Sequence, residues 1–217
     1  MHVFLDANIL YKDPFLKNGF LYLLKCLAKD GHIQLFISEA VYKEILHHFQ
    51  SQYVKLITDA KYAAHHINYL LKKNTVTIHV TEEEIVQYFE EKFFQNVYDG
   101  VIHIISTDER ILNKLIELEL SPVEPFFQLI KNTEGHHCYE KNIQEAITWY
   151  TYVNYISTHD LQDSYFITNK IELFSDIEQL KNMEAFSPHP NLVHHGMKLC
   201  FKTVRGYFNY LSFCVLV

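Results

Sequence analysis

A short apolar run near the start of the chain, made of Val3, Phe4 and Leu5, ends abruptly on Asp6. A run of this composition is typical of a buried strand, which delivers Asp6 at its C-terminal tip. In open α/β sheets the ligand crevice lies outside the carboxyl ends of the strands, so an acid there is placed for chemistry. The other interpretation is that Asp6 caps a following helix. The position of Asp6 in the sequence does not decide between these two interpretations.

The next seventy residues alternate between helical and extended patterns. Apolar residues at helical spacing predict a helix over 20–28, which Asp30 and Gly31 end. A short apolar segment at 33–37 predicts a second strand, and Ser38 is a good N-cap for a helix that starts at Glu39. Helical spacing continues to residue 71, as one long helix or a helical hairpin. Strand, helix, strand, helix predicts a parallel sheet with helices packed on it.

The span from about 75 to 139 fits this alternation less well. Residues 75–80 suit either a strand or an extended link, and Thr81 with Glu84 forms a capping-box signature for a helix through 94. A further helix is predicted from about 107 to 118, and prolines and polar residues then break the pattern. We therefore predict a helical insertion followed by a long loop. After it, we expect a helix over 140–156, a strand over 164–169 and one or two closing strands within 198–217.

Size and composition limit the class of protein. With 217 residues, 48% of them hydrophobic, the chain suits one large domain. We predict a nuclease-like domain over 1–185 and a C-terminal extension over 186–217 packed on it. The formal net charge of -7 argues against a broad duplex-binding face. Four cysteines without CxxC spacing indicate reduced thiols, and no signal peptide or membrane span is apparent, so a cytoplasmic location is expected.

Acidic and polar residues fall on four of the predicted elements. Asp6 ends a strand, Glu44 and Glu145 lie on helices, and Thr168 and Asn169 end another strand. These side chains can converge at one end of a parallel sheet. Hard divalent cations such as Mg²⁺ bind carboxylate oxygens, and two of them can drive in-line displacement at a phosphodiester. The arrangement predicts a metal site.

Four segments in this order resemble the motifs of PIN-domain nucleases. They are residues 4–10, which contain Asp6 and Asn8; residues 38–45, which contain Glu44; residues 124–126 and 142–149, which contain Glu145; and residues 165–169. The third segment is similar to that of a larger PIN-like subgroup, with an acid-Ala-Ile-x-Trp core. The similarity spans about residues 2–176, with the 75–139 insertion outside it.

The resemblance implies a three-layer α/β/α fold with a central, mostly parallel sheet, and Mg²⁺- or Mn²⁺-dependent hydrolysis of RNA. Carried over by residue, Asp6, Glu44 and Glu145 are the metal ligands, and Asn8 and Thr168 orient them and the attacking water. Two departures stand out. The third acid is Asp in most relatives and Glu145 here, and the slot of a fourth acid, after Thr168 and Asn169, holds Leu173. Glu172 and Asp176 are nearby substitutes outside that register.

Other functions fit the sequence less well. A haloacid-dehalogenase-type phosphatase needs a second acid where Asn8 stands, and without it the general acid is missing. Histidine pairs invite a zinc site, but His136, His137 and Cys138 lack a fourth ligand at standard spacing. Nucleophile-elbow, Walker and dinucleotide-binding motifs are absent from the sequence.

The leading hypothesis is therefore a metal-dependent endoribonuclease that acts on single-stranded or structured RNA, in a toxin or defence setting. The alternative is a catalytically degenerate PIN fold that serves as a nucleic-acid-binding or protein-interaction module. A homodimer and a protein inhibitor remain open as partners.

Overall fold

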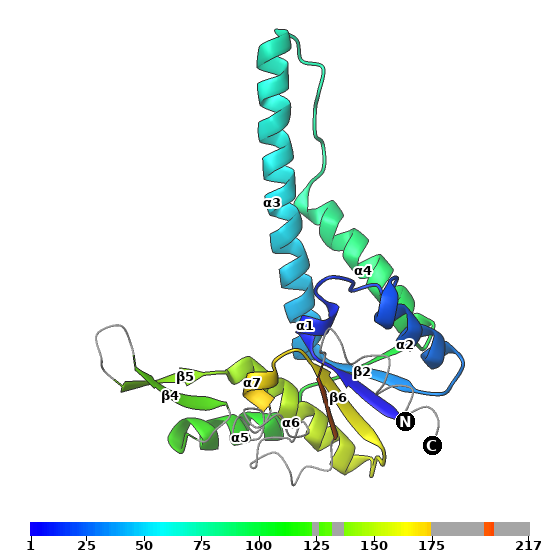
Figure 1. Ribbon diagram of the computed structural model, residues 1–217, viewed down its shortest axis with the longest axis vertical. Helices are drawn as coiled ribbons and strands as arrows, with labels where there is room; N and C mark the ends of the chain where they lie inside the picture. Colours follow the sequence, from blue (N-terminus) through cyan, green and yellow to red (C-terminus); the bar gives the residue numbers. More distant parts are fainter. Residues whose placement is uncertain (123–125, 132–136, 175–197, 202–217) are drawn as a thin grey trace.

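A parallel sheet forms the centre of the molecule, in the strand order β3-β2-β1-β6-β7 (Figure 1). The computed structural model describes residues 1–122, 126–131, 137–174 and 198–201. The strands are β1 (His2–Leu5), β2 (Gln34–Ser38), β3 (Ile102–Ile105), β6 (Ser164–Thr168) and β7 (Lys198–Phe201). Every neighbouring pair of these described strands is parallel. The predicted mixed α/β class with a parallel sheet is confirmed.

Helices cover both faces of the sheet, which confirms the three-layer α/β/α arrangement. Alternate residues of β1 divide between two cores, since Val3 and Leu5 belong to one cluster of buried side chains and Phe4 to the other. The first cluster receives side chains from α1 (Ala7–Leu10), α2 (Gly19–Lys29), α3 (Glu39–Leu71) and α4 (Glu82–Tyr98). The second receives side chains from α5 (Glu109–Leu120), α6 (Ile143–Thr158) and α7 (Ile171–Phe174).

Several predicted elements appear with nearly the predicted bounds. Ser38 accepts a hydrogen bond from the Val41 backbone and begins α3, which runs as one 33-residue helix and so settles the choice between a long helix and a hairpin. Thr81 and Glu84 form the predicted capping box at the start of α4. Residues 75–80 carry no strand and form the extended link between these two helices.

The prediction for residues 75–139 is wrong in two places. Ile102–Ile105 forms β3, which pairs with β2 at the edge of the main sheet, so a further strand and helix of the sheet lie where only an insertion and a loop were expected. The polar stretch predicted as a loop instead contributes to an antiparallel hairpin of β4 (Phe127–Lys131) and β5 (His137–Lys141). Because β5 extends to Lys141, α6 starts at Ile143 and not at 140.

The order of the strands determines where a site can form. β1 lies between β2 and β6, so the chain leaves β1 on one side for β2 and reaches β6 on the other. Ligands of open parallel sheets bind at such a switch, outside the carboxyl ends of the strands. Leu5 pairs with Ile167, which brings the next residues, Asp6 and Thr168, side by side at that edge. Among the described residues, no helix combines the length and apolarity needed to cross a bilayer.

Candidate active site

Asp6 lies at the end of β1 and is almost completely buried, with 4% of its surface exposed. One carboxylate oxygen accepts a hydrogen bond from the Ala7 backbone at 2.8 Å and so caps the short helix α1. The other oxygen accepts bonds from the Asn8 amide and the Thr168 hydroxyl. Asp6 thus both ends a strand and caps a helix, so these two positions do not exclude one another.

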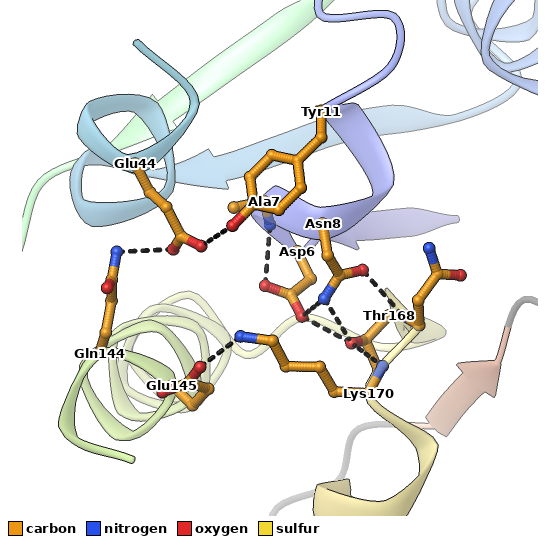
Figure 2. A network of polar contacts seen from close by, with 10 residues as sticks. Asp6, Ala7, Asn8, Tyr11, Glu44, Gln144, Glu145, Thr168 and Lys170 are labelled. Atoms are coloured by element: carbon orange, nitrogen blue, oxygen red, sulfur yellow. Dashed lines mark hydrogen bonds and ion pairs between the residues drawn. The ribbon is translucent and has the colours of Figure 1, made fainter. Parts of the chain in front are cut away.

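Asn8 and Thr168 hold the Asp6 carboxylate in place (Figure 2). The Asn8 side chain donates to Asp6 and, at 3.2 Å, to the Thr168 hydroxyl, while its oxygen accepts from the Asn169 backbone at 2.9 Å. Thr168 is fully buried, and its hydroxyl donates to Asp6 and accepts from the Lys170 backbone. Both side chains thus bind the Asp6 carboxylate directly. Asn169 contributes its backbone N–H to this network.

Glu44 reaches the same edge of the sheet from the second turn of α3. The Tyr11 hydroxyl donates to one of its oxygens, and the Gln144 amide donates to the other at 2.6 Å. Burial, followed by the contact with Glu44, raises the pKa of Tyr11. Tyr11 therefore stays protonated and holds the carboxylate from the side of α1, while Gln144 holds it from the side of α6.

Glu145, in the first turn of α6, forms an ion pair with Lys170. The Glu145 side chain is 16% exposed and the Lys170 side chain 32% exposed, so the pair is half-buried. Figure 2 shows the Lys170 side chain extending from the end of β6 toward the space bordered by Asp6, Glu44 and Glu145. Lys170 therefore supplies positive charge where the three predicted carboxylates converge.

The charges at this edge influence one another. Burial is the main cause that raises the pKa of Asp6, while the Thr168 hydrogen bond and the Lys170 charge act in the opposite direction. The pKa of Lys170 is raised even though desolvation lowers it, because the contact with Glu145 and the charges of Asp6 and Glu44 together favour the ammonium form. The site thus gathers acids around one resident cation.

Tyr152 connects the two strands that carry this arrangement, a role that the sequence analysis did not predict. The fully buried hydroxyl donates to the Leu5 carbonyl at 2.7 Å and accepts from the Ser38 backbone at 3.0 Å. It therefore ties the end of β1, just before Asp6, to the start of α3, which carries Glu44. No local sequence signal identifies such a contact, because the partners lie more than a hundred residues away.

The predicted replacements for a fourth acid lie outside the part of the chain whose side chains the structure describes. Leu173, in the slot of that acid, is 9% exposed and packs in the second core cluster next to Phe174. Glu172 lies in α7, but its side chain is outside the described residues, as is all of Asp176. Among the described side chains of this segment, Lys170 reaches the acids by pairing with Glu145, and the sequence analysis did not select it.

The carboxylate oxygens of Asp6, Glu44 and Glu145 are ligands of the kind that a hard divalent cation prefers. Figure 2 shows these three side chains, from three different elements, around one space. Within the described part of the chain, however, no group of three or more His, Cys, Asp or Glu residues is placed to hold a metal ion. The Lys170 ammonium, paired with Glu145, carries positive charge beside these acids.

Comparison with known protein families gives a match. A family model described as a PIN domain matches residues 3–174, which is most of the chain and includes β3 and both core clusters. No curated protein and no solved structure matches the chain.

Proposed function

Because this chain belongs to the PIN domain family, whose members are in general nucleases, we propose that it is a metal-dependent endoribonuclease. One observation carries this proposal: Asp6, Glu44 and Glu145 come from three different elements and border one space at the switch point of the sheet. Because carboxylates repel a negatively charged phosphodiester, an acidic site at this position can act on such a substrate only if it also holds a cation. The proposed substrate is single-stranded or structured RNA, in a toxin or defence setting in the cytoplasm.

In this proposal Asp6, Glu44 and Glu145 hold Mg²⁺ or Mn²⁺. When bound, such a cation would supply Lewis-acid stabilisation of the negative charge on the phosphoryl and leaving oxygens. The chain's own residues prepare the site. Asn8 and Thr168 fix the orientation of the Asp6 carboxylate, and Tyr11 and Gln144 fix that of Glu44.

Lys170 compensates the acids before a cation arrives. Its ammonium pairs with Glu145 and lies in the field of Asp6 and Glu44, so the carboxylates can stay together without a metal. Residues 168–170 lie in one turn, and the Lys170 backbone donates to the Thr168 hydroxyl at 3.0 Å. The same turn therefore orients Asp6 and carries the resident cation.

The test is cleavage of labelled single-stranded RNA with Mg²⁺ or Mn²⁺ by the wild type and by Asp6→Asn. We expect a loss of about 100-fold or more in Asp6→Asn, since removing one group that stabilises charge in the transition state typically has that effect. Asp99→Asn is the matched control, because Asp99 pairs with Lys29 at the surface and is far from this site. Equal cleavage by the wild type and Asp6→Asn would refute the role of Asp6.

A second candidate function is a degenerate PIN fold that binds without cleaving. Lys170 among the acids and Leu173 in the core favour it, because Lys170 neutralises part of the negative charge that a metal would use and Leu173 stands in the slot of the fourth acid. Calorimetric titration with Mn²⁺ separates the two functions. A nuclease loses Mn²⁺ binding in Glu145→Gln, whereas the degenerate fold gives no binding that depends on Glu145.

A further inference from the structure

The outer part of α3, residues 51–71, projects away from the sheet with the link of residues 72–81 beside it (Figure 1). Asn68 fastens the link to the helix. Its side-chain oxygen accepts from the backbones of Thr75 and Val76 at 2.9 and 3.0 Å, and its amide donates to the Val76 carbonyl at 2.8 Å. The projecting arm is thus a defined structure, but most of its residues are exposed.

One stripe of this arm has the spacing of a coiled-coil seam. Starting from the buried Phe49, positions separated alternately by four and three residues are Tyr53, Leu56, Ala60, Ala63, Ile67 and Leu70. The exposed fractions are 40% for Tyr53, 59% for Leu56, 43% for Ile67 and 77% for Leu70. Along 18 residues the seam is about 26 Å long at 1.5 Å per residue. A seam with this spacing is complementary to another helix.

The link covers a different stripe of the helix. The least exposed positions of the arm are Ala64, which is buried, and Val54, Ile57, Ala60 and Asn68, which are partly exposed. Asn68 is the member of that stripe that binds the link. The seam borders this stripe at Ala60 and otherwise faces outward. The Tyr53 ring packs against Phe49 at the base of the arm, with ring centroids 4.3 Å apart, whereas Leu56, Ile67 and Leu70 remain 59%, 43% and 77% exposed on the described chain.

We propose that the seam pairs with the same seam of a second copy of this chain, in an antiparallel two-helix contact. The inference rests on the order of the side chains along the seam. If Ala60 faces Ala63 of the second copy, then Leu56 faces Ile67 and Tyr53 faces Leu70, so small residues meet at the centre and large ones at both ends. The seam is therefore complementary to itself when reversed, as a two-fold interface requires. In this register Asp59 also flanks His66 of the second copy.

The charge of the arm argues for a helix and not for RNA along the seam. Residues 51–80 carry four lysines and one aspartate, but none of these charged residues occupies a seam position. Nucleic acid binds through phosphate contacts, which need cationic side chains on the contact surface. An apolar seam with polar residues beside it is the pattern of a helix pair. This inference does not depend on the nuclease proposal.

The experiment is sedimentation velocity of the full chain over a concentration series, for the wild type and two matched variants. Leu56→Glu places a charge in the seam, and Tyr62→Glu places the same charge on a different face of the same helix, where Tyr62 is 67% exposed. We expect a dimer for the wild type and Tyr62→Glu. We expect a dissociation constant raised about 100-fold in Leu56→Glu, because a charge must be buried against Ile67 of the second copy.

A double variant tests the antiparallel register. In Leu56→Glu with Ile67→Lys, each new glutamate faces a new lysine of the second copy, so dimerisation should recover. In a parallel pair Leu56 faces its own counterpart, so the double variant would not recover, and this result would overturn the register. A wild type that stays monomeric throughout, or a dimer that Leu56→Glu leaves intact, would overturn the proposal. A wild-type monomer that instead binds added single-stranded RNA through Leu56 would assign the seam to nucleic acid and also overturn it.

Discussion

Replacement of Lys170 by methionine removes the resident cation while it keeps much of the apolar volume of the side chain. The Lys170 and Glu145 side chains are 32% and 16% exposed, so their ion pair lies between the surface and buried classes. Exposed pairs contribute about 0–1 kcal/mol, and breaking a buried pair costs about 3–5 kcal/mol. We therefore expect Lys170→Met to lower the free energy of unfolding by about 1–3 kcal/mol at neutral pH without metal.

Added Mn²⁺ should reverse this loss. With the ammonium gone, the three carboxylates lose the cation that competes with a metal. A ligand that binds only the folded state stabilises it by RT ln(1 + [L]/Kd), so tighter Mn²⁺ binding gives greater stabilisation. The assay is urea unfolding of the wild type and Lys170→Met, each with and without Mn²⁺. Mn²⁺ should raise the free energy of unfolding more in Lys170→Met than in the wild type.

Lys29→Met is the control for this experiment. Lys29 also pairs with an acid, Asp99, at 3.5 Å, but its side chain is 48% exposed and lies far from the site. We expect no measurable change in the unfolding of Lys29→Met with or without Mn²⁺. Stability of Lys170→Met equal to that of the wild type, or equal stabilisation of both by Mn²⁺, would refute the assignment of Lys170 as the compensating cation.

Three further predictions follow from single contacts. Tyr152→Phe leaves the buried Leu5 carbonyl and Ser38 N–H without their partner, so chemical denaturation should show a loss of about 1–3 kcal/mol; wild-type stability would contradict this. Burial raises the pKa of Asp6 above its ordinary value of 3.8. Protonated Asp6 therefore stabilises the fold fully below pH 3.8, and this stabilisation is lost as the pH rises through the raised pKa. The free energy of unfolding of Asp6→Asn minus that of the wild type should therefore increase from about pH 4 to about pH 7, and a constant difference would contradict it. Asn68→Ala removes the bonds to Thr75 and Val76, so hydrogen exchange at these two amides should accelerate while global stability stays unchanged; unchanged exchange would show that Asn68 does not hold the link.

The elements that surround the site were predictable because their signals are local. An apolar run that ends on Asp6 marks β1, the Ser38 cap marks the start of α3, and the segment before Asn169 marks β6. Parallel strands bring such ends to one edge, so the convergence of Asp6, Glu44 and Thr168 follows from the order of elements alone.

Other features depend on contacts that the sequence does not encode locally. β3 is only four residues long, and its side chains do not alternate clearly between buried and exposed, so its pattern could not be separated from a link. β4 and β5 are stabilised by pairing with each other, which their polar sequence conceals. Lys170 and Tyr152 act on residues far away in the chain, and an ordinary lysine or tyrosine carries no sign of its partner.

The central claim is that Asp6, Glu44 and Glu145 bind a catalytic divalent cation at the end of β1. The most direct test is a crystal structure of the protein soaked in Mn²⁺, with anomalous scattering to locate the ion. The account predicts one or more anomalous peaks within bonding distance of Asp6 and Glu145, with Lys170 displaced from Glu145. A fully soaked crystal with no peak at these carboxylates, and with the Lys170–Glu145 pair intact, would contradict it.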